Sequence, residues 1–300
     1  MALRDDILAS FEAILDRCAV EAPELLDVLR QRLDEALAKR GALSGAVDDD
    51  GWYGMIGESP PMLALRDVIE KFAAAHAPVL ITGESGTGKE RAAHALHHLS
   101  PRHAQSFVAE NCAAIPEALL ESVLFGHRKG SFTGAIKDHP GHFVAAHKGT
   151  LFLDEVGEMS MQMQAKLLRA LQEGEVRAVG DHRVRKVDVR VIAATNQDLE
   201  GAVKAGRFRE DLYFRLNVLG LVVPPLRERS GDVALLARRF LADACARSGR
   251  SVSLSPEAER ALLSRRWPGN VRQLQNEMAR AAALASGSEL RADELTPDGA

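Results

Sequence analysis

Apolar residues follow two kinds of pattern along the chain, short uninterrupted runs and repeats at helical spacing. Short apolar runs that predict strands cover residues 79–81, 107–110, 149–153, 189–196 and 219–223. The runs at 79–81, 149–153 and 189–196 are typical of buried parallel strands. Helical spacing covers residues 62–75 before the first run, residues 90–99 and 162–172 between the runs, and residues 232–248, 255–266 and 270–285 after the last run. Alternating strands and helices followed by helices alone predict an α/β domain and a smaller, all-helical unit.

Residues 1–40 form a separate helical segment in this prediction. Two apolar stripes at helical spacing are separated by Pro23, and Leu25 to Leu37 carry the second stripe. The pattern favours a helical hairpin or a short self-associating segment. Packing onto the main domain and a regulatory or partner-binding role both remain open. Residues 41–51, rich in Gly, Ser and Asp, are expected to be a linker.

The composition limits the class of protein. A net charge of −4 over 300 residues gives no overall basic character, so charge balance does not argue for nucleic-acid binding. Three cysteines lie far apart and suit neither a zinc cluster nor a disulfide framework, which favours a reducing cytoplasm. No apolar run has the length of a membrane span, and the first residues lack the features of a signal peptide. We expect a cytoplasmic protein without a membrane anchor.

Candidate chemistry begins with a phosphate loop directly after the first strand. The pattern G-x-x-x-x-G-K is carried by Gly83, Glu84, Ser85, Gly86, Thr87, Gly88 and Lys89. Glycines let backbone N–H groups converge on an anion, and the following helix directs its positive end there. Such turns also occur for packing alone, but the strand–loop–helix order favours nucleotide binding. Glu90 replaces the usual Ser or Thr, so Mg²⁺ must rely on Thr87, on water or on an acid elsewhere.

Two later strands end in polar residues that should meet this loop. Asp154 and Glu155 follow the strand at 149–153, and we expect Asp154 to hold Mg²⁺ and Glu155 to orient an attacking water. The alternative is a helix start. Thr195 and Asn196 end the strand at 189–196, level with these acids, where they can sense a γ-phosphate. Asn111, at another strand end, is most simply a turn residue.

Three stretches leave alternatives open. Residues 125–135 read Phe-Gly-His-Arg-Lys-Gly-Ser-Phe-Thr-Gly-Ala, which suits a tight turn with Phe132 in the core or a mobile loop that presents Phe132 and Thr133 outward. Gly180-Asp181 predicts a hairpin within residues 176–191. Its cations are expected on a solvated face, with a DNA contact as the alternative, namely Arg183, Arg185, Lys186 and Arg190. By spacing alone, the arginines at 207–215 are ordinary surface residues.

Five motifs together give a specific resemblance. They are residues 83–90, 125–135, 149–155, 208–216 (Phe-Arg-Glu-Asp-Leu-Tyr-Phe-Arg-Leu) and 267–274 (Trp-Pro-Gly-Asn-Val-Arg-Gln-Leu). The region from about residue 52 to 292 resembles the AAA+ domain of the sigma-54-dependent transcriptional activators, the bacterial enhancer-binding proteins. This family usually has Glu after the phosphate-loop lysine, as here. The resemblance implies a five-stranded parallel P-loop sheet flanked by helices over 52–228, a helical lid over 229–292 and a tail over 293–300.

The resemblance also implies roles at an ATP site. The loop from Gly83 to Glu90 would bind ATP with Mg²⁺, and Asp154 and Glu155 would form the Walker B pair. Asn111 would pair with Glu155 as a switch. Thr195 and Asn196 match sensor I, and Arg272 matches sensor II.

Further implied roles concern neighbouring molecules. Arg209 and Arg215 match arginine fingers that enter the ATP site of an adjacent subunit, most simply in a hexamer. Residues 130–135 match the family's sigma-factor contact loop and are Gly130, Ser131, Phe132, Thr133, Gly134 and Ala135. Ser131 departs from the family's Ala, but Phe132 and Thr133 are intact, so we expect the contact function to persist, with altered coupling as the alternative. The hairpin would be the companion of this loop.

The function implied is an ATP-hydrolysing activator that remodels the closed complex of sigma-54 RNA polymerase holoenzyme so that the promoter opens. The residues after Leu284 look too short for the family's helix-turn-helix, and residues 1–51 match no sensory domain. The alternative is therefore a nucleotide-binding co-regulator that joins a mixed ring with a DNA-binding activator. In either case any DNA contact is expected to be indirect or weak.

Overall fold

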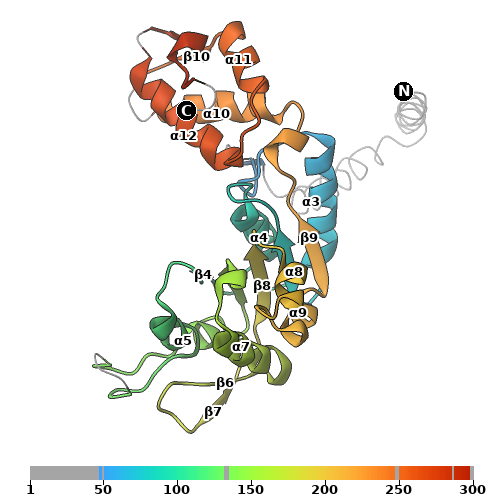
Figure 1. The fold of residues 1–300 in the computed structure, drawn as a ribbon, viewed down its shortest axis with the longest axis vertical. Helices are drawn as coiled ribbons and strands as arrows, with labels where there is room; N and C mark the ends of the chain where they lie inside the picture. Colours follow the sequence, from blue (N-terminus) through green and yellow to red (C-terminus); the bar gives the residue numbers. More distant parts are fainter. Residues whose placement is uncertain (1–46, 49–50, 132–134, 247–249, 286, 298–300) are drawn as a thin grey trace, which may run out of the picture. The chain divides into compact units, whose positions relative to one another are not determined.

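A five-stranded parallel sheet organises the larger part of the chain (Figure 1). The computed structural model describes residues 47–48, 51–131, 135–246, 250–285 and 287–297. The strands run in the order β4-β5-β8-β3-β9. Their bounds are β3 (Val79–Thr82), β4 (Phe107–Asn111), β5 (Thr150–Asp154), β8 (Arg190–Thr195) and β9 (Leu219–Val222). Every neighbouring pair is parallel, so the predicted α/β fold with a five-stranded parallel sheet is confirmed.

Helices cover both faces of the sheet. Successive side chains of a strand point to opposite faces, so Val79 and Ile81 pack with one set of helices and Leu80 with the other. The first set comprises α3 (Pro60–Ala73) and α4 (Lys89–His98). The second comprises α5 (Glu117–Phe125), α6 (His142–Ala145), α7 (Met161–Glu173), α8 (Leu199–Lys204) and α9 (Glu210–Leu216). Burial on both faces explains why the inner strands β3, β5 and β8 have uninterrupted apolar runs rather than alternating ones. The edge strands β4 and β9 are mostly half-buried or exposed.

Local signals set the ends of several helices. Ser160 caps α7, because its hydroxyl accepts from the N–H of Met163, and Gly174 ends this helix in the left-handed conformation with φ of 62°. Ser255 caps α11 in the same way, with Pro256 at the first helical position. Short-range side-chain and backbone preferences therefore set the ends of these two helices.

The residues after the sheet form a second hydrophobic core. It is built from α10 (Asp232–Ala246), α11 (Pro256–Leu263) and α12 (Asn270–Leu284). Two short 3₁₀ turns, η2 (Leu226–Glu228) and η3 (Ala292–Glu294), lie before and after these helices, and a third, η1 (Val156–Glu158), follows β5 in the α/β part. The expectation that this part is helical throughout is wrong in one detail. Two short strands, β10 (Ser253–Leu254) and β11 (Glu289–Leu290), pair in parallel there. Leu290 and Leu295 are buried in this core despite the polar sequence around them.

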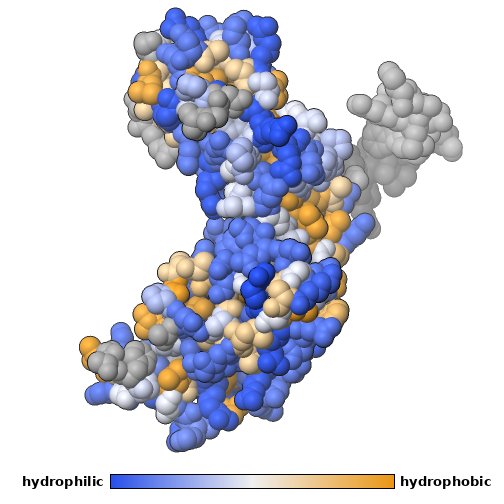
Figure 2. Space-filling view, viewed as in Figure 1, coloured by the Kyte–Doolittle hydropathy of each residue, from blue (hydrophilic) through white to orange (hydrophobic). Residues whose placement is uncertain are grey.

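The predicted hairpin is confirmed as β6 (Glu175–Arg177) and β7 (Val184–Lys186), which pair in antiparallel fashion. Ahead of α3 lie two short strands, β1 (Val47–Asp48) and β2 (Gly51–Trp52). The face shown in Figure 2 is mostly hydrophilic, with hydrophobic residues in separate patches. Among the described residues, no helix has the length and hydrophobicity to cross a membrane.

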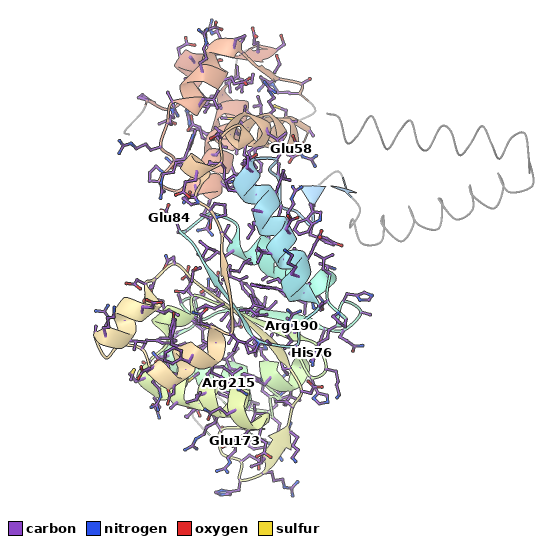
Figure 3. The ribbon with its side chains drawn as sticks, turned by 90° about the vertical axis from the view of Figure 1, so that its right-hand side faces the viewer. Glu58, His76, Glu84, Glu173, Arg190 and Arg215 are labelled. Atoms are coloured by element: carbon purple, nitrogen blue, oxygen red, sulfur yellow. The ribbon has the colours of Figure 1, made fainter. Side chains whose placement is uncertain are left out.

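Arg190 corrects one expectation about the hairpin region. We expected it on a solvated face, but it begins the central strand β8 and is only 2% exposed. Its guanidinium donates to the carbonyl oxygens of Phe72 and Ala73 at 2.7 and 2.9 Å, at the end of α3 (Figure 3). The last carbonyls of a helix lack partners within the helix, so a buried arginine satisfies them. Burial lowers the pKa of Arg190 to about 10.

Two expectations lie outside the described residues. The helical hairpin predicted for residues 1–40 is one. The other concerns Phe132, Thr133 and Gly134 at the tip of the loop 130–135, so neither alternative for Phe132 is decided.

Candidate functional site

The predicted phosphate loop connects β3 to α4 at the carboxyl end of the sheet. Lys89 is the first residue of α4, is 7% exposed, and donates from Nζ to the carbonyl oxygen of Gly83 at 3.0 Å. The hydroxyl of Thr87, also buried, donates to the carbonyl oxygen of Glu84 at 2.9 Å. Gly88 has a φ of 104°, which a residue with Cβ adopts only under strain. The loop therefore surrounds its own lysine and directs the N-terminus of α4 at the same point.

Asp154 and Glu155 lie opposite this loop, where β5 ends. The backbone N–H of Glu155 donates to Oδ1 of Asp154 at 3.0 Å. Burial, and then the charge of Glu155, raise the pKa of Asp154. Glu155 has a φ of 53°. For a residue other than glycine this conformation costs on the order of 1 kcal/mol or more, and such strain is concentrated at functional sites.

The carboxylate of Glu155 connects three segments of the site. Its Oε1 lies 3.8 Å from Nζ of Lys89, and its Oε2 accepts from the backbone N–H of Asn196 at 3.2 Å. The same strand end carries Thr195, which is fully buried and accepts from the N–H of Gln197 at 3.1 Å. The sequence expectation that the loop lysine, the two acids and the end of β8 come together is thus met by the geometry.

Residues of α12 hold the phosphate loop from the other side. Arg272 donates from its backbone N–H to the carbonyl oxygen of Gly86 and from Nη1 to the hydroxyl of Ser85, both at 3.3 Å. A Cβ on Gly86 would lie 2.4 Å from the carbonyl oxygen of Gly269, so only glycine fits there. The predicted Arg272 therefore lies at the loop.

Asn270 also lies at the phosphate loop, which the sequence did not predict. It is fully buried with a φ of 52°, and its Nδ2 donates to the carbonyl oxygen of Ser85 at 3.0 Å and to Glu84 Oε2 at 3.1 Å. Its Oδ1 accepts from the N–H of Leu226 at 2.8 Å. Arg227 forms a two-point ion pair with the same Glu84, and the bonds from Arg227 and Asn270 lower the pKa of that carboxyl. The only available signal was the turn Trp-Pro-Gly-Asn before α12.

A cleft of ≈ 360 Å³ lies between the phosphate loop and the helices α10 and α12 of the second core. One wall is polar and includes the loop from Ser85 to Arg91 together with Asp154, Glu155 and Arg272. The other wall is apolar and is lined by Ile56, Met62, Leu236, Phe240 and Val271. A ligand with an anionic end and a flat apolar end, such as a nucleoside phosphate, matches both walls.

The cleft suits a magnesium ion that accompanies such a ligand. Asp154 and Glu155 offer carboxylate oxygens, the ligand type that Mg²⁺ prefers. No group of three or more His, Cys, Asp and Glu side chains among the described residues has the geometry to hold a metal unaided. An ion here would therefore need phosphate oxygens and water as further ligands.

Arg209 and Arg215 are not part of the cleft. Arg209, before α9, pairs with Asp211 through two hydrogen bonds of 3.0 and 2.7 Å. Arg215 is exposed and donates to the carbonyl oxygen of Leu171 at 2.7 Å. Figure 3 shows Arg215 well apart from Glu84 of the phosphate loop. A role for either arginine at an ATP site would thus require a second copy of the chain, and it stays a prediction.

The side chain of Asn111 forms its hydrogen bond with a residue other than Glu155. β4 and β5 pair in a register that sets Asn111 beside Asp154. Its Oδ1 accepts from the N–H of Ala113 at 2.9 Å, as a turn residue does. Within the described part of the chain, the hydrogen bonds of Glu155 go elsewhere, so the switch pairing stays a prediction.

Comparison with known proteins identifies the family. Residues 55–222 match the family described as the Sigma-54 interaction domain, and residues 227–299 match the AAA+ ATPase lid domain. The chain belongs to the Sigma-54 interaction domain family. The resemblance inferred from the motifs is therefore confirmed, and so is the fold of an AAA+ domain followed by a helical lid.

Members of the Sigma-54 interaction domain family that are similar to this chain are transcriptional regulators. The anaerobic nitric oxide reductase transcription regulator NorR of Salmonella paratyphi C is 56% identical over 232 residues, which cover 77% of this chain and 46% of the relative. The Nif-specific regulatory protein of Azotobacter vinelandii is 49% identical over 253 residues, 83% of this chain and 48% of the relative. The hydrogenase transcriptional regulatory protein HoxA of Cupriavidus necator is 48% identical over 283 residues, which cover 93% of this chain and 57% of the relative.

Solved structures with a similar fold support the same family assignment. A crystal structure of NtrX from Brucella abortus in complex with ATP superimposes with a TM-score of 0.75 at 35% identity, over 92% of this chain and 60% of that chain. NtrX in complex with ADP gives a TM-score of 0.74 at 34% identity. The chain spans about half the length of the curated relatives it matches.

Proposed function

We propose that this Sigma-54 interaction domain hydrolyses ATP and uses the energy to remodel sigma-54 RNA polymerase holoenzyme at closed promoter complexes. The observation that carries the proposal is the carboxylate of Glu155, which lies between Nζ of Lys89 and the N–H of Asn196. This arrangement links a phosphate-binding lysine, an acid suited to orient water and a strand end that can respond to a γ-phosphate. RNA polymerase acts in the cytoplasm, so this function assigns the chain to that compartment.

The chemistry follows from positioning and charge. Lys89 would leave the carbonyl oxygen of Gly83 and bind the β- and γ-phosphate oxygens, while the N-terminus of α4 adds its partial positive charge. Glu155 would orient the attacking water and accept its proton. Asp154 would help to hold Mg²⁺, which supplies positive charge against the phosphates when bound. Arg272 and Asn270, through Ser85, would report the state of the loop to the lid.

Arg209 and Arg215 would complete the site of an adjacent subunit in a ring, which we propose to be a homo-hexamer. Both guanidiniums lie on or next to α9 and outside the cleft of their own chain. On the same segment of the chain, Phe214 and Val218 are 65% and 52% exposed. Exposed apolar residues next to arginines are typical of protein interfaces.

Substitution of the water-orienting acid tests the enzyme. Glu155→Gln should keep ATP binding, because Lys89 and the loop remain, but lower the hydrolysis rate by at least 100-fold, on the order of 3 kcal/mol in the barrier. The measurement is phosphate release together with ATP titration of the purified chain, and its size with and without nucleotide. A variant that hydrolyses ATP at the parent rate would refute the assignment. A parent chain that binds ATP without turnover would instead support the co-regulator of a mixed ring.

The sigma-factor contact is tested separately at the loop 130–135. Thr133→Ala should leave the ATPase rate within about twofold and abolish open-complex formation at a sigma-54 promoter, since the change removes a contact and not a catalytic group. Open complexes are scored by permanganate reactivity of unpaired thymines. Normal promoter opening by this variant would exclude the loop from the mechanism.

A further inference from the structure

The two insertions that project from the sheet are joined to each other by backbone hydrogen bonds. The first is the loop between α5 and α6, and its two arms pair where His127 and His139 exchange N–H···O bonds of 2.9 Å. The second is the β6–β7 hairpin. Arg128 donates from its N–H to the carbonyl oxygen of Val179 at 3.0 Å, and the N–H of Val179 donates to the carbonyl oxygen of Gly126 at 2.9 Å. The loop and the hairpin thus form one three-stranded ribbon.

The guanidinium of Arg128 bridges all three strands of this ribbon. Its Nε donates to Oδ2 of Asp181 on the hairpin at 2.7 Å, and its Nη1 binds Oδ2 of Asp138 on the returning arm of the loop. Both carboxylates are in turn oriented by the backbone. Oδ1 of Asp138 accepts from the N–H of Lys129 at 2.8 Å, and Oδ1 of Asp181 accepts from the N–H of Arg183 at 3.0 Å. These bonds lower the pKa of both carboxyls.

The bridge lies near the solvent, which limits what it does for folding. The Arg128 side chain is 35% exposed, and exposed ion pairs contribute little to stability. The planar guanidinium instead fixes direction, because its donors can meet two carboxylates only in one arrangement of the strands. Close packing between the loop and the hairpin also limits their relative positions, since a Cβ on Gly180 would lie 2.7 Å from Cβ of Ser131. Hairpin and loop are therefore closely apposed at that point.

The position of the ribbon in the chain gives the bridge a function. The loop leads into β5, which ends at Asp154, and the hairpin leads into β8, which ends at Thr195. At their far ends these neighbouring strands are joined by the bond from Asn196 N–H to Glu155. A displacement of one strand relative to the other at the nucleotide would separate the two insertions unless something held them together.

We infer that Arg128 is a positioning residue that makes the loop and the hairpin move as one body. The inference rests on the proposed function, because the loop is assigned there to the sigma factor. Arg128 touches neither the cleft nor the reacting phosphate. Its loss should therefore uncouple ATP hydrolysis from promoter opening rather than slow hydrolysis.

Three variants test the inference in the 300-residue chain. Arg128→Ala should keep the ATPase rate within about twofold and reduce the rate of open-complex formation at least tenfold. Arg128→Lys keeps the charge but not the planar fork of donors, so it should recover only part of the lost rate of open-complex formation. Arg128→Asp combined with Asp181→Arg restores one bridge with reversed polarity and should be more active than either single change. Arg238→Ala is the matched control, because Arg238 forms an exposed ion pair with Glu259 in the lid.

A distance measurement separates this inference from the proposed function. Spin labels on cysteines at positions 137 and 183, in a chain without its native cysteines, report the separation of loop arm and hairpin. Arg128→Ala should broaden the distance distribution whether or not the chain opens promoters, whereas Arg238→Ala should not. An unchanged distribution would overturn the inference, as would a parallel fall of ATPase and promoter opening. A parent chain that never opens promoters would refute the proposed function alone.

Discussion

At the scale of single residues, His97 makes the stability of the domain depend on pH. It lies on the inner face of α4, is 3% exposed, and its Nδ1 is 2.9 Å from the hydroxyl oxygen of Thr150. Burial, and then the electrostatic influence of the neighbouring imidazoles of His98 and His94, lower the pKa of His97 to about 4. The unfolded chain therefore binds a proton on His97 at a pH where the folded chain does not.

The sign of the effect follows from this order. Above pH 6.5 the contribution of neutral His97 is fully present, and it is lost as the pH falls from about 6.5 to 4. At pH 5 the loss should amount to about 2 kcal/mol, by the linkage relation. Urea unfolding at pH 7.5 and pH 5 measures it, with His97→Gln as the variant that cannot titrate and His76→Gln as an exposed control. If His97→Gln retained the full pH dependence of the parent, another group would be responsible.

Residue-level prediction from the sequence succeeded where a local motif determines the neighbours. Lys89 is placed by the loop it belongs to, six residues from the carbonyl it contacts. Arg190 was assigned to the wrong environment, because its partners Ala73 and Phe72 are 117 and 118 residues away. A charged residue at the start of a strand looks the same in sequence whether it faces solvent or the end of another helix.

At the scale of elements, Asn270 connects the start of α12 to the phosphate loop and to the segment that follows the sheet. Asn270→Ala removes two partners of buried backbone groups and places Ala at a φ of 52°, so it should destabilise the fold by about 2–4 kcal/mol and weaken ATP binding at least tenfold. Asn270→Gly relieves the backbone strain but does not restore the lost hydrogen bonds, so it should recover only a small part of the lost stability and ATP affinity. Fluorescent ATP titration and urea unfolding measure both effects. Equal ATP affinity in all three proteins would remove Asn270 from the site.

The elements themselves differ in how well the sequence predicts them. The inner strands β3, β5 and β8 have apolar runs because both of their faces are covered, and this signal is strong. The strands β10 and β11 have two residues each and carry no such run, so their pairing was missed. The link through Asn270 was missed for a similar reason, since Ser85 lies 185 residues earlier. Long-range contacts of this kind leave no periodic pattern.

At the scale of the whole molecule, a buried ion pair joins the lid to the start of the α/β part. Arg229 and Asp232 are 2% and 1% exposed, and their atoms Nε and Oδ2 are 3.0 Å apart. Asp232 also accepts from the N–H and the hydroxyl of Ser59, directly before α3, and Arg229 donates to the carbonyl oxygen of Ile56. The cleft depends on both parts, because its apolar wall includes Ile56 and Leu236.

Removal of one partner should therefore affect both parts at once. Asp232→Ala leaves the guanidinium of Arg229 buried without a counter-charge, which should destabilise the fold by about 3–5 kcal/mol. Because the lost bonds connect lid and sheet, calorimetry should show one unfolding transition in the parent and two in the variant. Replacing both residues by apolar ones, Arg229→Met with Asp232→Leu, removes the unpaired charge and should restore most of the stability but not the coupling. A single, unshifted transition in Asp232→Ala would mean that the contacts of α12 with the phosphate loop, rather than this ion pair, hold the lid in place.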